Sequence, residues 1–544
     1  MDNNKLAELL FPHIDKLPSY WEEKYPKRSL PEGAMVTRLA PSPTGFIHLG
    51  NLYGALADER MARLSGGVFY LRIEDTDKKR EVENGVDIII KTLSYFGIHF
   101  DEGACTDGET GDYGPYRQRQ RAEIYQTYVK ELVRQGRAYP CFCTEEELTA
   151  MRAEQEQKKL NFGYYGVFAK YRDASFETVE ALVNQGVPYV LRFKSMGSLE
   201  KRINVADMIR GEINMPENDQ DIVILKSDGI PTYHFAHAVD DHLMGTTHVV
   251  RGEEWLATLP VHVELFGALG FDLPIYAHTA QLMKMDGESK RKLSKRKDPE
   301  LSLDYYRQEG YLTEAVLHYL MTVLNSNFEE WAAENPDKTM YDFPFSPQKM
   351  SISGSLFDLD KLNDVSKEIL CHMKAEDIYD GLCDWAQEFD PEFYAVFTKD
   401  KALSMAALSV GRGDPKPRKD LVTFRQAASF LRFYYDELFA AEDALPETMS
   451  KEEAEVIIDA YLQSYDHTDE QPVWFEKIRE IARENGYAAQ TKEYKKNPEA
   501  FKGHIGDVSS VLRLAITGRL NSPDFHQISH IIGEESMRKR LENF

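Results

Sequence analysis

Residues 38–51 read Arg-Leu-Ala-Pro-Ser-Pro-Thr-Gly-Phe-Ile-His-Leu-Gly-Asn, a proline-stiffened turn between an expected strand at residues 35–40 and an expected helix at residues 51–64. Gly66-Gly67 ends the helix, and residues 68–73, Val-Phe-Tyr-Leu-Arg-Ile, supply a second buried strand. This pattern predicts a compact βαβ unit. The N-terminus of such a helix presents unpaired N–H groups and a positive dipole end, which suit a nucleotide phosphate.

Two residues of the turn and one later segment fit a phosphate site. His48 can donate a hydrogen bond to phosphate oxygens, and Gly50 allows a ring to approach the backbone closely. Far along the chain, Lys292-Leu-Ser-Lys-Arg296 can stabilise charge that develops on a triphosphate. Neither segment has the glycines of the dinucleotide fingerprint or the Walker pattern. Each segment alone is weak, but their order and the βαβ context indicate a two-part ATP site.

The composition is that of a large protein without a membrane segment. The chain has 544 residues, enough for several domains, and its five cysteines form no disulfide-like framework. It opens with Met-Asp-Asn-Asn-Lys rather than a basic and apolar leader, and it has no apolar run long enough to span a bilayer. These features predict a cytoplasmic protein with no membrane partner.

The net charge argues against a nucleic-acid partner. The chain carries 65 Lys and Arg against 90 Asp and Glu, a net charge of −25, whereas phosphate contacts normally supply much of the affinity for nucleic acids. Net charge describes solubility and long-range repulsion, however, and binding depends on where the cations cluster. Charge alone therefore does not decide the partner.

The chain on either side of the βαβ unit is mostly helical. Residues 1–34 predict short helices at 5–17 and 19–23, which we interpret as a packing element. An amphipathic helix that starts near Tyr116 and ends at Gly136 leads into an insertion. Strands at 221–225 and 248–251 are expected to complete the parallel sheet, and helical patterns dominate beyond Ser302.

In this order, the segments resemble the class I aminoacyl-tRNA synthetases, and specifically the bacterial-type glutamyl-tRNA synthetases. Residues 38–51 resemble the family's HIGH motif, and Lys292 to Arg296 resemble its KMSKS motif. The likeness covers nearly everything from residue 35 onward. The further motifs are Leu71-Arg-Ile-Glu-Asp-Thr-Asp77, Ser227-Asp-Gly-Ile-Pro-Thr-Tyr-His-Phe235, Val239-Asp-Asp-His242, Val250-Arg-Gly-Glu-Glu-Trp255, Ser302-Leu-Asp-Tyr-Tyr-Arg-Gln-Glu-Gly-Tyr-Leu312, Phe357-Asp-Leu-Asp-Lys-Leu362 and Leu514-Ala-Ile-Thr-Gly518.

The resemblance implies an α/β fold, with a class I Rossmann-like catalytic domain, an inserted acceptor-binding region, and an all-α stem-contact and anticodon-binding part. The expected divisions are a helical extension at 1–34, the first half of the catalytic domain at 35–115, the acceptor-stem-binding insertion at 116–220, the second catalytic half at 221–285, the KLSKR loop and stem-contact region at 286–375, and the helical anticodon-binding domain at 376–544.

The implied activity is ATP-dependent attachment of L-glutamate to tRNA-Glu. A glutamyl-adenylate forms first, pyrophosphate leaves, and the glutamyl group then passes to the terminal ribose of the tRNA as AMP is released. tRNA-Gln is a second acceptor that the sequence leaves open. Mg²⁺ should accompany the triphosphate as a bridging ion. The family is usually monomeric, so a monomer is expected.

The resemblance implies six glutamate-binding residues. Arg38 and Arg251 are guanidinium forks for the carboxylates, and Arg251 is assigned to the side-chain carboxylate. Glu74 supplies an anion for the ammonium group. The remaining three positions are Ser42, Tyr233 and His237, the last standing where relatives often carry Asn or an aliphatic residue.

ATP, by the same resemblance, lies across both halves of the predicted site. Activation is an in-line attack on the α-phosphorus, so it needs positioning and charge stabilisation rather than a protein nucleophile. The catalytic residues are assigned as His48 and Lys295, with Lys292 in support, and no metal ligand is assigned. The full ATP-binding set is His48, Gly50, Glu254, Trp255, Lys292, Ser294, Lys295 and Arg296.

Two departures from the family pattern bear on the site. Asn51 stands where the general class signature has a second His. Cys141-Phe-Cys143 could form half of a zinc site, but residues 161–170 contain neither the Cys nor the His that completes it in some relatives. The sequence therefore predicts two ordinary cysteines and no zinc.

Competing readings come from other classes. A cluster of His and Asp residues could serve a metal-dependent phosphohydrolase, although it leaves the KLSKR segment unexplained. A nucleotidyltransferase with an HxG-type motif would lack the long helical C-terminal third, and a short relative that glutamylates a modified base would end near KLSKR. The cluster consists of His234, His237, Asp240, Asp241, His242 and His248.

Overall fold

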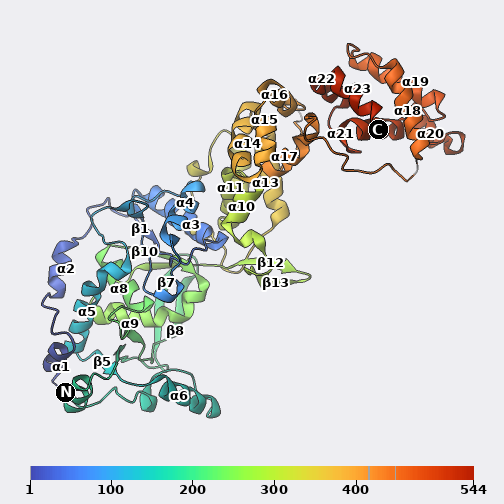
Figure 1. Cartoon of the computed structure of the whole chain (residues 1–544). Helices are drawn as coiled ribbons and strands as arrows, with labels where there is room; N and C mark the ends of the chain where they lie inside the picture. The colour runs from blue at the N-terminus through green and yellow to red at the C-terminus, as the bar shows by residue number, and fades with distance from the viewer. Residues whose placement is uncertain (1, 414–416, 448) are drawn as a thin grey trace. The chain divides into compact units, whose positions relative to one another are not determined.

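The computed structural model describes residues 2–413, 417–447 and 449–544, which form two compact units (Figure 1). The first unit comprises residues 1–305 and 317–358, and the second comprises residues 306–316 and 359–544. The first unit mixes strands and helices, whereas the described residues of the second unit carry helices and no strand. The predicted fold class, an α/β catalytic domain followed by an all-α part, is confirmed.

The βαβ unit predicted from residues 35–73 is present. β1 (Val36–Leu39) runs into α3 (Leu49–Ser65), and β2 (Val68–Leu71) returns parallel to β1, with Arg38 opposite Tyr70. Gly66 ends the helix at φ +68°, a backbone region that favours glycine. Every residue of β1 and all of β2 except Val68 are buried, as is typical of parallel strands covered by helices.

Two groups of parallel strands meet beside β1. β2 pairs in parallel with β3 (Glu102–Cys105), and β4 (Gly108–Thr110) adds an antiparallel edge. In the second half, β10 (His248–Gly252) pairs in parallel with β11 (Ile275–Thr279). Thr247, at the start of β10, joins the two groups: its N–H donates to the carbonyl of Val36 at 3.0 Å, and its hydroxyl accepts from the N–H of Val36 at 2.8 Å.

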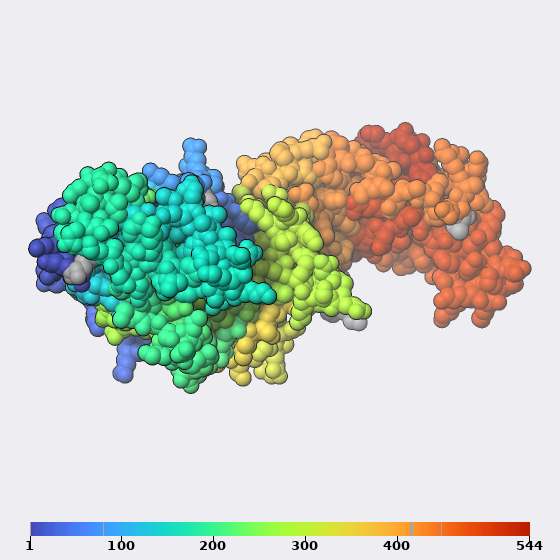
Figure 2. Space-filling model, turned by 90° about the horizontal axis from the view of Figure 1, so that it is seen from below, coloured from blue at the N-terminus to red at the C-terminus, as the bar shows by residue number. Residues whose placement is uncertain are grey.

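The region between the two halves forms sheets of its own. β5 (Ala138–Cys141), β6 (Val190–Phe193) and β9 (Val223–Leu225) make an antiparallel sheet. The prediction that residues 221–225 join the parallel sheet is therefore wrong: the three-residue strand packs on β6, a pairing that periodicity cannot reveal. The inserted residues, coloured cyan to green, make up much of the visible face of the first unit (Figure 2).

One hairpin of this region extends the catalytic sheet. β7 (Arg202–Asp207) pairs antiparallel with β8 (Gly211–Pro216) and touches β11 in parallel, with Asp207 opposite Tyr276. Asp207 thereby lies beside the start of β11. The helices around these strands are α4 (Gly85–Tyr95), α5 (Ala122–Arg134), α6 (Glu145–Gln157), α7 (Phe176–Asn184), α8 (Tyr233–Leu243) and α9 (Leu259–Leu269).

The N-terminal segment packs on α5. It forms α1 (Asn3–Leu10) and α2 (Pro18–Lys24), beside α5 in Figure 1. The indole N–H of Trp21 donates to Thr127 Oγ1 at 3.1 Å, and the ammonium of Lys130 donates to the carbonyl oxygens of Phe11 and Ile14. The interpretation of residues 1–34 as a packing element agrees with these contacts.

The KLSKR segment follows a hairpin of β12 (Leu282–Asp286) and β13 (Ser289–Lys292), and β14 (Ser355–Leu356) pairs with β12. α10 (Leu303–Glu309), α11 (Thr313–Leu324) and α12 (Phe328–Glu334) follow. The second unit continues with α13 (Leu359–His372), α14 (Ala375–Phe389), α15 (Pro391–Phe397), α16 (Lys401–Ser409), α17 (Phe424–Leu431), α18 (Lys451–Ser464), α19 (Gln471–Glu484), α20 (Thr491–Lys496), α21 (Ile505–Thr517), α22 (Phe525–Ile532) and α23 (Glu534–Glu542).

Within the described residues, no helix combines the length and apolar character needed to cross a bilayer.

Replacing Asp240 should destabilise the first unit strongly. This fully buried carboxylate accepts from Arg121 at 2.7 Å, Tyr125 at 2.7 Å and Gln118 at 3.0 Å. Asp240→Ala leaves a buried guanidinium unpaired, which should lower the free energy of unfolding by about 3 to 5 kcal/mol. Glu154→Ala, which breaks an exposed pair with Lys158, should cost less than about 1 kcal/mol. Urea unfolding followed by circular dichroism compares the two, and equal losses would contradict the expectation.

Candidate active site

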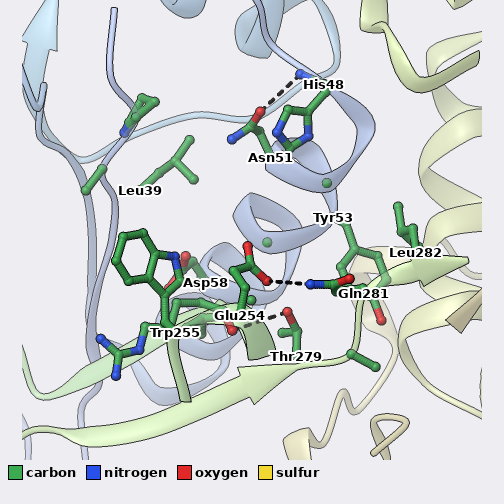
Figure 3. Close-up of a pocket in the computed structure, with 18 of the residues that line it drawn as sticks. Leu39, His48, Asn51, Tyr53, Asp58, Glu254, Trp255, Thr279, Gln281 and Leu282 are labelled. Carbon is green, nitrogen blue, oxygen red and sulfur yellow. Dashed lines mark hydrogen bonds between the residues drawn. The ribbon is translucent and has the colours of Figure 1, made fainter. Parts of the chain in front are cut away.

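A cavity of about 340 Å³ opens in the first unit where the ends of β1 and β10 meet the start of α3. Ligands bind at this edge of open α/β sheets because the carboxyl ends of parallel strands face it. Figure 3 shows His48, just before α3, and Asn51 on its first turn at the top of the view, with Glu254 and Trp255 below them. The predicted site residues that line the cavity are Arg38, His48, Gly50, Glu74, Tyr233, Arg251, Glu254, Trp255 and Lys292.

The other predicted residues lie off this lining. Ser42 is exposed, and Ser294, Lys295 and Arg296 belong to the loop after β13. His237 is fully buried behind Tyr233, whose ring stacks on it at 5.9 Å. Position alone tests none of the roles, so all of the site assignments, in the lining and off it, stay predictions.

Asn51 shapes the first turn of α3. Its Oδ1 accepts from the backbone N–H of His48 at 3.0 Å (Figure 3), so the residue that replaces the class's second His caps the helix. A Cβ on Gly50 would lie 3.0 Å from two atoms of the His48 ring. Glycine at this position therefore lets the imidazole lie over the turn.

His48 carries an unused polar atom. Its Nδ1 is buried and has no hydrogen-bond partner within the described residues. Burial lowers the pKa of His48, and the positive charge of Lys292 lowers it further. The ring is therefore neutral at physiological pH and keeps one N–H to donate. The negative charge of a triphosphate would raise its proton affinity.

Asp298 anchors the KLSKR loop from behind. Its carboxylate accepts two bonds from Arg291, at 2.6 and 2.8 Å, and one from the backbone N–H of Ser294 at 2.8 Å. The hydrogen bonds from Arg291 are the main reason that the pKa of Asp298 is lowered to about 2. The loop cations themselves are not held this way: among the described residues, no carboxylate forms an ion pair with Lys292, Lys295 or Arg296.

Lys295 reaches back toward the first motif. Its ammonium nitrogen lies 3.8 Å from the centre of the Phe46 ring, two residues before His48. Such a contact between a cation and an aromatic face is attractive. The two sequence motifs, separated along the chain, are thus brought together.

Two adjacent glutamates after β10 face different ways. Glu254 lines the cavity, and its Oε2 accepts from Gln281 Nε2 at 3.3 Å (Figure 3). Glu253 instead holds the turn, through Arg210 at 2.6 Å and the backbone N–H of Gln281 at 3.1 Å. The neighbouring Trp255 ring lies 4.3 Å from the Tyr233 ring.

A buried ion network supports the opposite end of the cavity. Asp241 on α8 accepts from Arg72 at 2.5 Å and from Arg38 at 3.3 Å. Arg72 also donates to Glu74 at 3.3 Å. Burial nevertheless raises the pKa of Glu74 to about 7, against the opposing effect of Arg72.

Arg251 is held differently from these arginines. It is nearly buried at the end of β10 and lines the cavity. Imidazoles of His278 and His262 accept from its Nε and Nη1, at 2.9 and 3.0 Å. Its Nη2 is buried without a hydrogen-bond partner in the described residues, which leaves a donor for a ligand.

One face of α3 also lines the cavity, although none of its residues was among the predicted site residues. Asn51, Gly54 and Asp58 all line the cavity and follow one helical face at spacings of three and four residues. That spacing is the signal in the sequence by which these residues could have been assigned to the site. Burial raises the pKa of Asp58 well above its usual range, and its Oδ1 has no partner among the described residues. Burial therefore disfavours the charged form of Asp58 in the lining.

The competing metal-cluster reading fails on geometry. Asp240 accepts from Arg121 and Asp241 from Arg72, whereas His242 binds Glu22 at 2.9 Å and His234 binds His262 at 2.9 Å. Within the described residues, the group spaced to share a metal ion is instead Glu368, Cys371 and His372, on α13. The six residues of the cluster therefore do not form a phosphohydrolase centre.

Cys141 and Cys143 flank a tyrosine. Their sulfurs lie 3.4 and 3.5 Å from the hydroxyl oxygen of Tyr164. The third group beside the thiols is thus a phenol, which is not among the usual zinc ligands. The expectation of no zinc stays a prediction.

Known proteins match both parts of the chain. Residues 34–362 match the model "tRNA synthetases class I (E and Q), catalytic domain", and residues 418–544 match "Anticodon binding domain". A "Glutamate--tRNA ligase" of Acetivibrio thermocellus is 58% identical over 100% of both chains, and one of Clostridium perfringens is 52% identical with the same coverage. A crystal structure of a glutamate tRNA ligase from Elizabethkingia meningosepticum, in complex with its amino acid, has a TM-score of 0.73 at 30% identity, and covers 94% of this chain and 98% of that one.

The fold and the two-part site thus define a class I aminoacyl-tRNA synthetase of the group that handles glutamate and glutamine. The resemblance noted in the sequence is confirmed at this level. The chain belongs to the glutamate–tRNA ligase family, which makes it an enzyme.

Amino-acid affinity should depend on pH through Glu74. An ammonium group prefers the ionised carboxylate, whose pKa in the structure is about 7, against 4.5 in water. Affinity should therefore be full above pH 7 and fall about tenfold per pH unit below it. Titration calorimetry with glutamate between pH 5.5 and 8 measures this slope. The Glu74→Gln variant should bind glutamate weakly, and its affinity should not change with pH in this range. An unchanged slope in that variant would exclude Glu74 as the titrating group.

Proposed function

We propose that the chain attaches L-glutamate to tRNA-Glu, and that the cavity is where glutamate and ATP form glutamyl-adenylate. Family membership and full-length similarity to glutamate–tRNA ligases support the activity. The observation that carries the assignment to this cavity is the guanidinium of Arg251, which has an unsatisfied donor in the lining that also holds His48 and Lys292. A buried cation of this kind suits a substrate whose side chain is a carboxylate.

The amino acid would be bound by charges at one end of the cavity. Arg251 receives the side-chain carboxylate, Arg38 the α-carboxylate, and Glu74 the ammonium group. Tyr233 packs along the substrate. Ser42 and His237 complete the predicted set, with His237 acting from behind Tyr233.

ATP would lie at the other end. The class as a whole uses ATP with Mg²⁺, and we assign the adenosine to Gly50, Glu254 and Trp255 and the triphosphate to His48 and the loop cations Lys292, Lys295 and Arg296, with Ser294 in the same loop. Such a cation set suits three phosphates. Mg²⁺ usually binds through phosphates and water rather than a protein cage, and Glu254 is the exposed carboxylate of this end that could add to it. When bound, the ion neutralises charge on the departing pyrophosphate.

In this arrangement the protein positions and stabilises rather than attacking. Arg38 and Glu74 hold the amino acid so that its α-carboxylate faces the α-phosphorus, with pyrophosphate opposite. His48 donates its N–H to the phosphate oxygens, and the ammonium group of Lys295 stabilises the negative charge that develops as pyrophosphate leaves. Neither residue forms a covalent bond. The glutamyl group then passes to the terminal ribose of the tRNA.

The partners follow from the same assignment. The anticodon-binding model at residues 418–544 supports tRNA as a partner of the second unit. We keep tRNA-Gln as a second acceptor, the domain divisions predicted from the sequence, and a monomeric cytoplasmic enzyme as parts of the proposal. Charging assays with glutamate and glutamine on purified tRNA-Glu and tRNA-Gln test the acceptors directly.

His48→Ala and Lys295→Ala test the activation step. Each removes a cation or donor that stabilises charge in the transition state, so glutamyl-adenylate formation with tRNA present should slow about 10² to 10³-fold, or roughly 3 to 4 kcal/mol. Folding should change little, because His48 is half-buried and Lys295 is exposed. Lys297→Ala is the matched control in the same loop. Turnover near the wild-type rate in either test variant would contradict the assignment.

Arg251→Gln tests amino-acid selection. Losing the charged fork should cost about 2 to 5 kcal/mol in kcat/KM for glutamate. Glutamine is neutral and should lose much less, so the glutamate-to-glutamine ratio should shrink. Arg251→Lys, which keeps the charge but not the fork, should retain more of this ratio. Equal losses for both amino acids would assign Arg251 to the α-carboxylate and pass the side-chain role to Arg38.

A further inference from the structure

Arg251 is fixed by two histidines from different elements. His278 lies directly opposite it on the neighbouring strand β11, and its Nε2 accepts from Arg251 Nε at 2.9 Å. His262 on α9 accepts from Arg251 Nη1 through Nδ1 at 3.0 Å. Both histidines are fully buried. Two of the three guanidinium nitrogens are thus bound to imidazoles, and Nη2 is left for a ligand.

The proton positions in this cluster follow from Arg251. A guanidinium only donates, so the ring nitrogen that faces it must be unprotonated. The proton of His278 is then on Nδ1, which lies 2.7 Å from Asp207 Oδ2, and the proton of His262 is on Nε2, which lies 2.9 Å from His234 Nδ1. Each ring is neutral, and a second proton would set N–H against N–H. Burial lowers the pKa of His262 and of His278 in agreement with this.

Arg251 differs from the other buried arginines of the site in whether a carboxylate neutralises its charge. Arg38 and Arg72 both pair with the carboxylate of Asp241, at 3.3 and 2.5 Å. Arg251, in contrast, forms no ion pair with any described carboxylate, and its nearest anion along the chain of contacts, Asp207, lies behind the ring of His278. Neutral acceptors satisfy its donors without neutralising it. Since a buried charge interacts strongly with its surroundings, this difference acts on whatever binds at Nη2.

We propose that His262 and His278 are positioning residues that set the preference for an anionic over a neutral amino-acid side chain, by holding Arg251 without compensating its charge. The inference rests on the proposed function, in which Arg251 receives the side-chain carboxylate. A carboxylate at either histidine position would compensate the guanidinium in advance. The substrate's carboxylate would then gain little, and it would face a like charge, whereas the amide of glutamine would be affected much less.

Isosteric variant pairs separate charge from shape. His262 uses Nδ1, which Asn and Asp mimic, and His278 uses Nε2, which Gln and Glu mimic. His262→Asn and His278→Gln should keep the glutamate-to-glutamine ratio of kcat/KM within about threefold of wild type, because a neutral acceptor remains. His262→Asp and His278→Glu should lower that ratio by about 30-fold or more, mainly by raising KM for glutamate. Each pair loses the same second partner, His234 or Asp207, so only the charge differs within a pair.

Controls decide between failure of the inference and failure of the proposed function. The Kd for ATP, measured by calorimetry, should stay near the wild-type value in all four variants, because ATP is assigned to the other end of the cavity. Equal shifts of the ratio within each pair would mean that the histidines only pack against Arg251, and would overturn the inference. Loss of ATP binding in both charged variants would overturn it as well, since the carboxylate would then act on the whole fold.

Arg251→Gln, assayed alongside, reports on the proposed function itself. If the glutamate-to-glutamine ratio of kcat/KM falls in Arg251→Gln but stays near wild type in the charged histidine variants, the role of Arg251 stands and the inference about the histidines fails. If Arg251→Gln affects glutamate and glutamine equally, the assignment of the side-chain carboxylate fails, whatever the histidine variants do.

Discussion

The carboxylate of Asp241 is the interaction on which the catalytic unit depends. It lies on α8 and pairs with Arg38 from β1 and Arg72 from the end of β2, at 3.3 and 2.5 Å. All three side chains are buried, and none could be ionised there alone, because an unpaired buried charge costs several kcal/mol. The next residue back, Asp240, lies 3.9 Å from Arg72 Nε and accepts from Arg121, beside α5, at 2.7 Å. Two adjacent aspartates on one helix thus join the first sheet to the helical layer that carries the N-terminal segment.

Local charge, rather than net charge, then explains how so acidic a chain offers sites for anions. The balance of 65 basic to 90 acidic residues would repel a polyanion at long range. Around the cavity, however, two of the buried carboxylates add little negative charge: Asp241, behind the lining, pairs with Arg38 and Arg72, and burial raises the pKa of Asp58 well above its usual range. The cations of the lining, Arg251 and Lys292, are not compensated by a described carboxylate. Uncompensated cations can therefore face the cavity in a protein of charge −25.

The local elements of the site could be predicted from the sequence, and the tertiary ones could not. The βαβ unit and the identity of His48, Arg251 and Lys292 follow from short motifs, since a strand, a turn and a helix start are set by neighbouring residues. The pairing of residues 223–225 with β6 was missed because three residues carry no usable period. Gln281 reaches the cavity only through the β11–β12 junction and shows no motif. His237 was assigned to the pocket by the family resemblance, but it lies one layer behind, 2.8 Å from Asp241.

One arrangement recurs at both ends of the cavity: the carboxylate that stabilises the site stands behind the group that supports the cation. At one end Asp207 holds His278, which holds Arg251. At the other, Asp298 holds Arg291 and the backbone of Ser294, which shape the loop that presents Lys295. A carboxylate in direct contact with either cation would fix its position equally well, but it would also compete with the substrate's anion for the same charge. When the carboxylate is separated from the cation by one intervening group, the geometry stays fixed, because the hydrogen bonds between them are short and directional. The cation then keeps more of its attraction for a ligand's anion than it would beside a directly contacting carboxylate. Rigid placement and free charge are then compatible in the same side chain, which is the condition for catalysis by preorganised electrostatics.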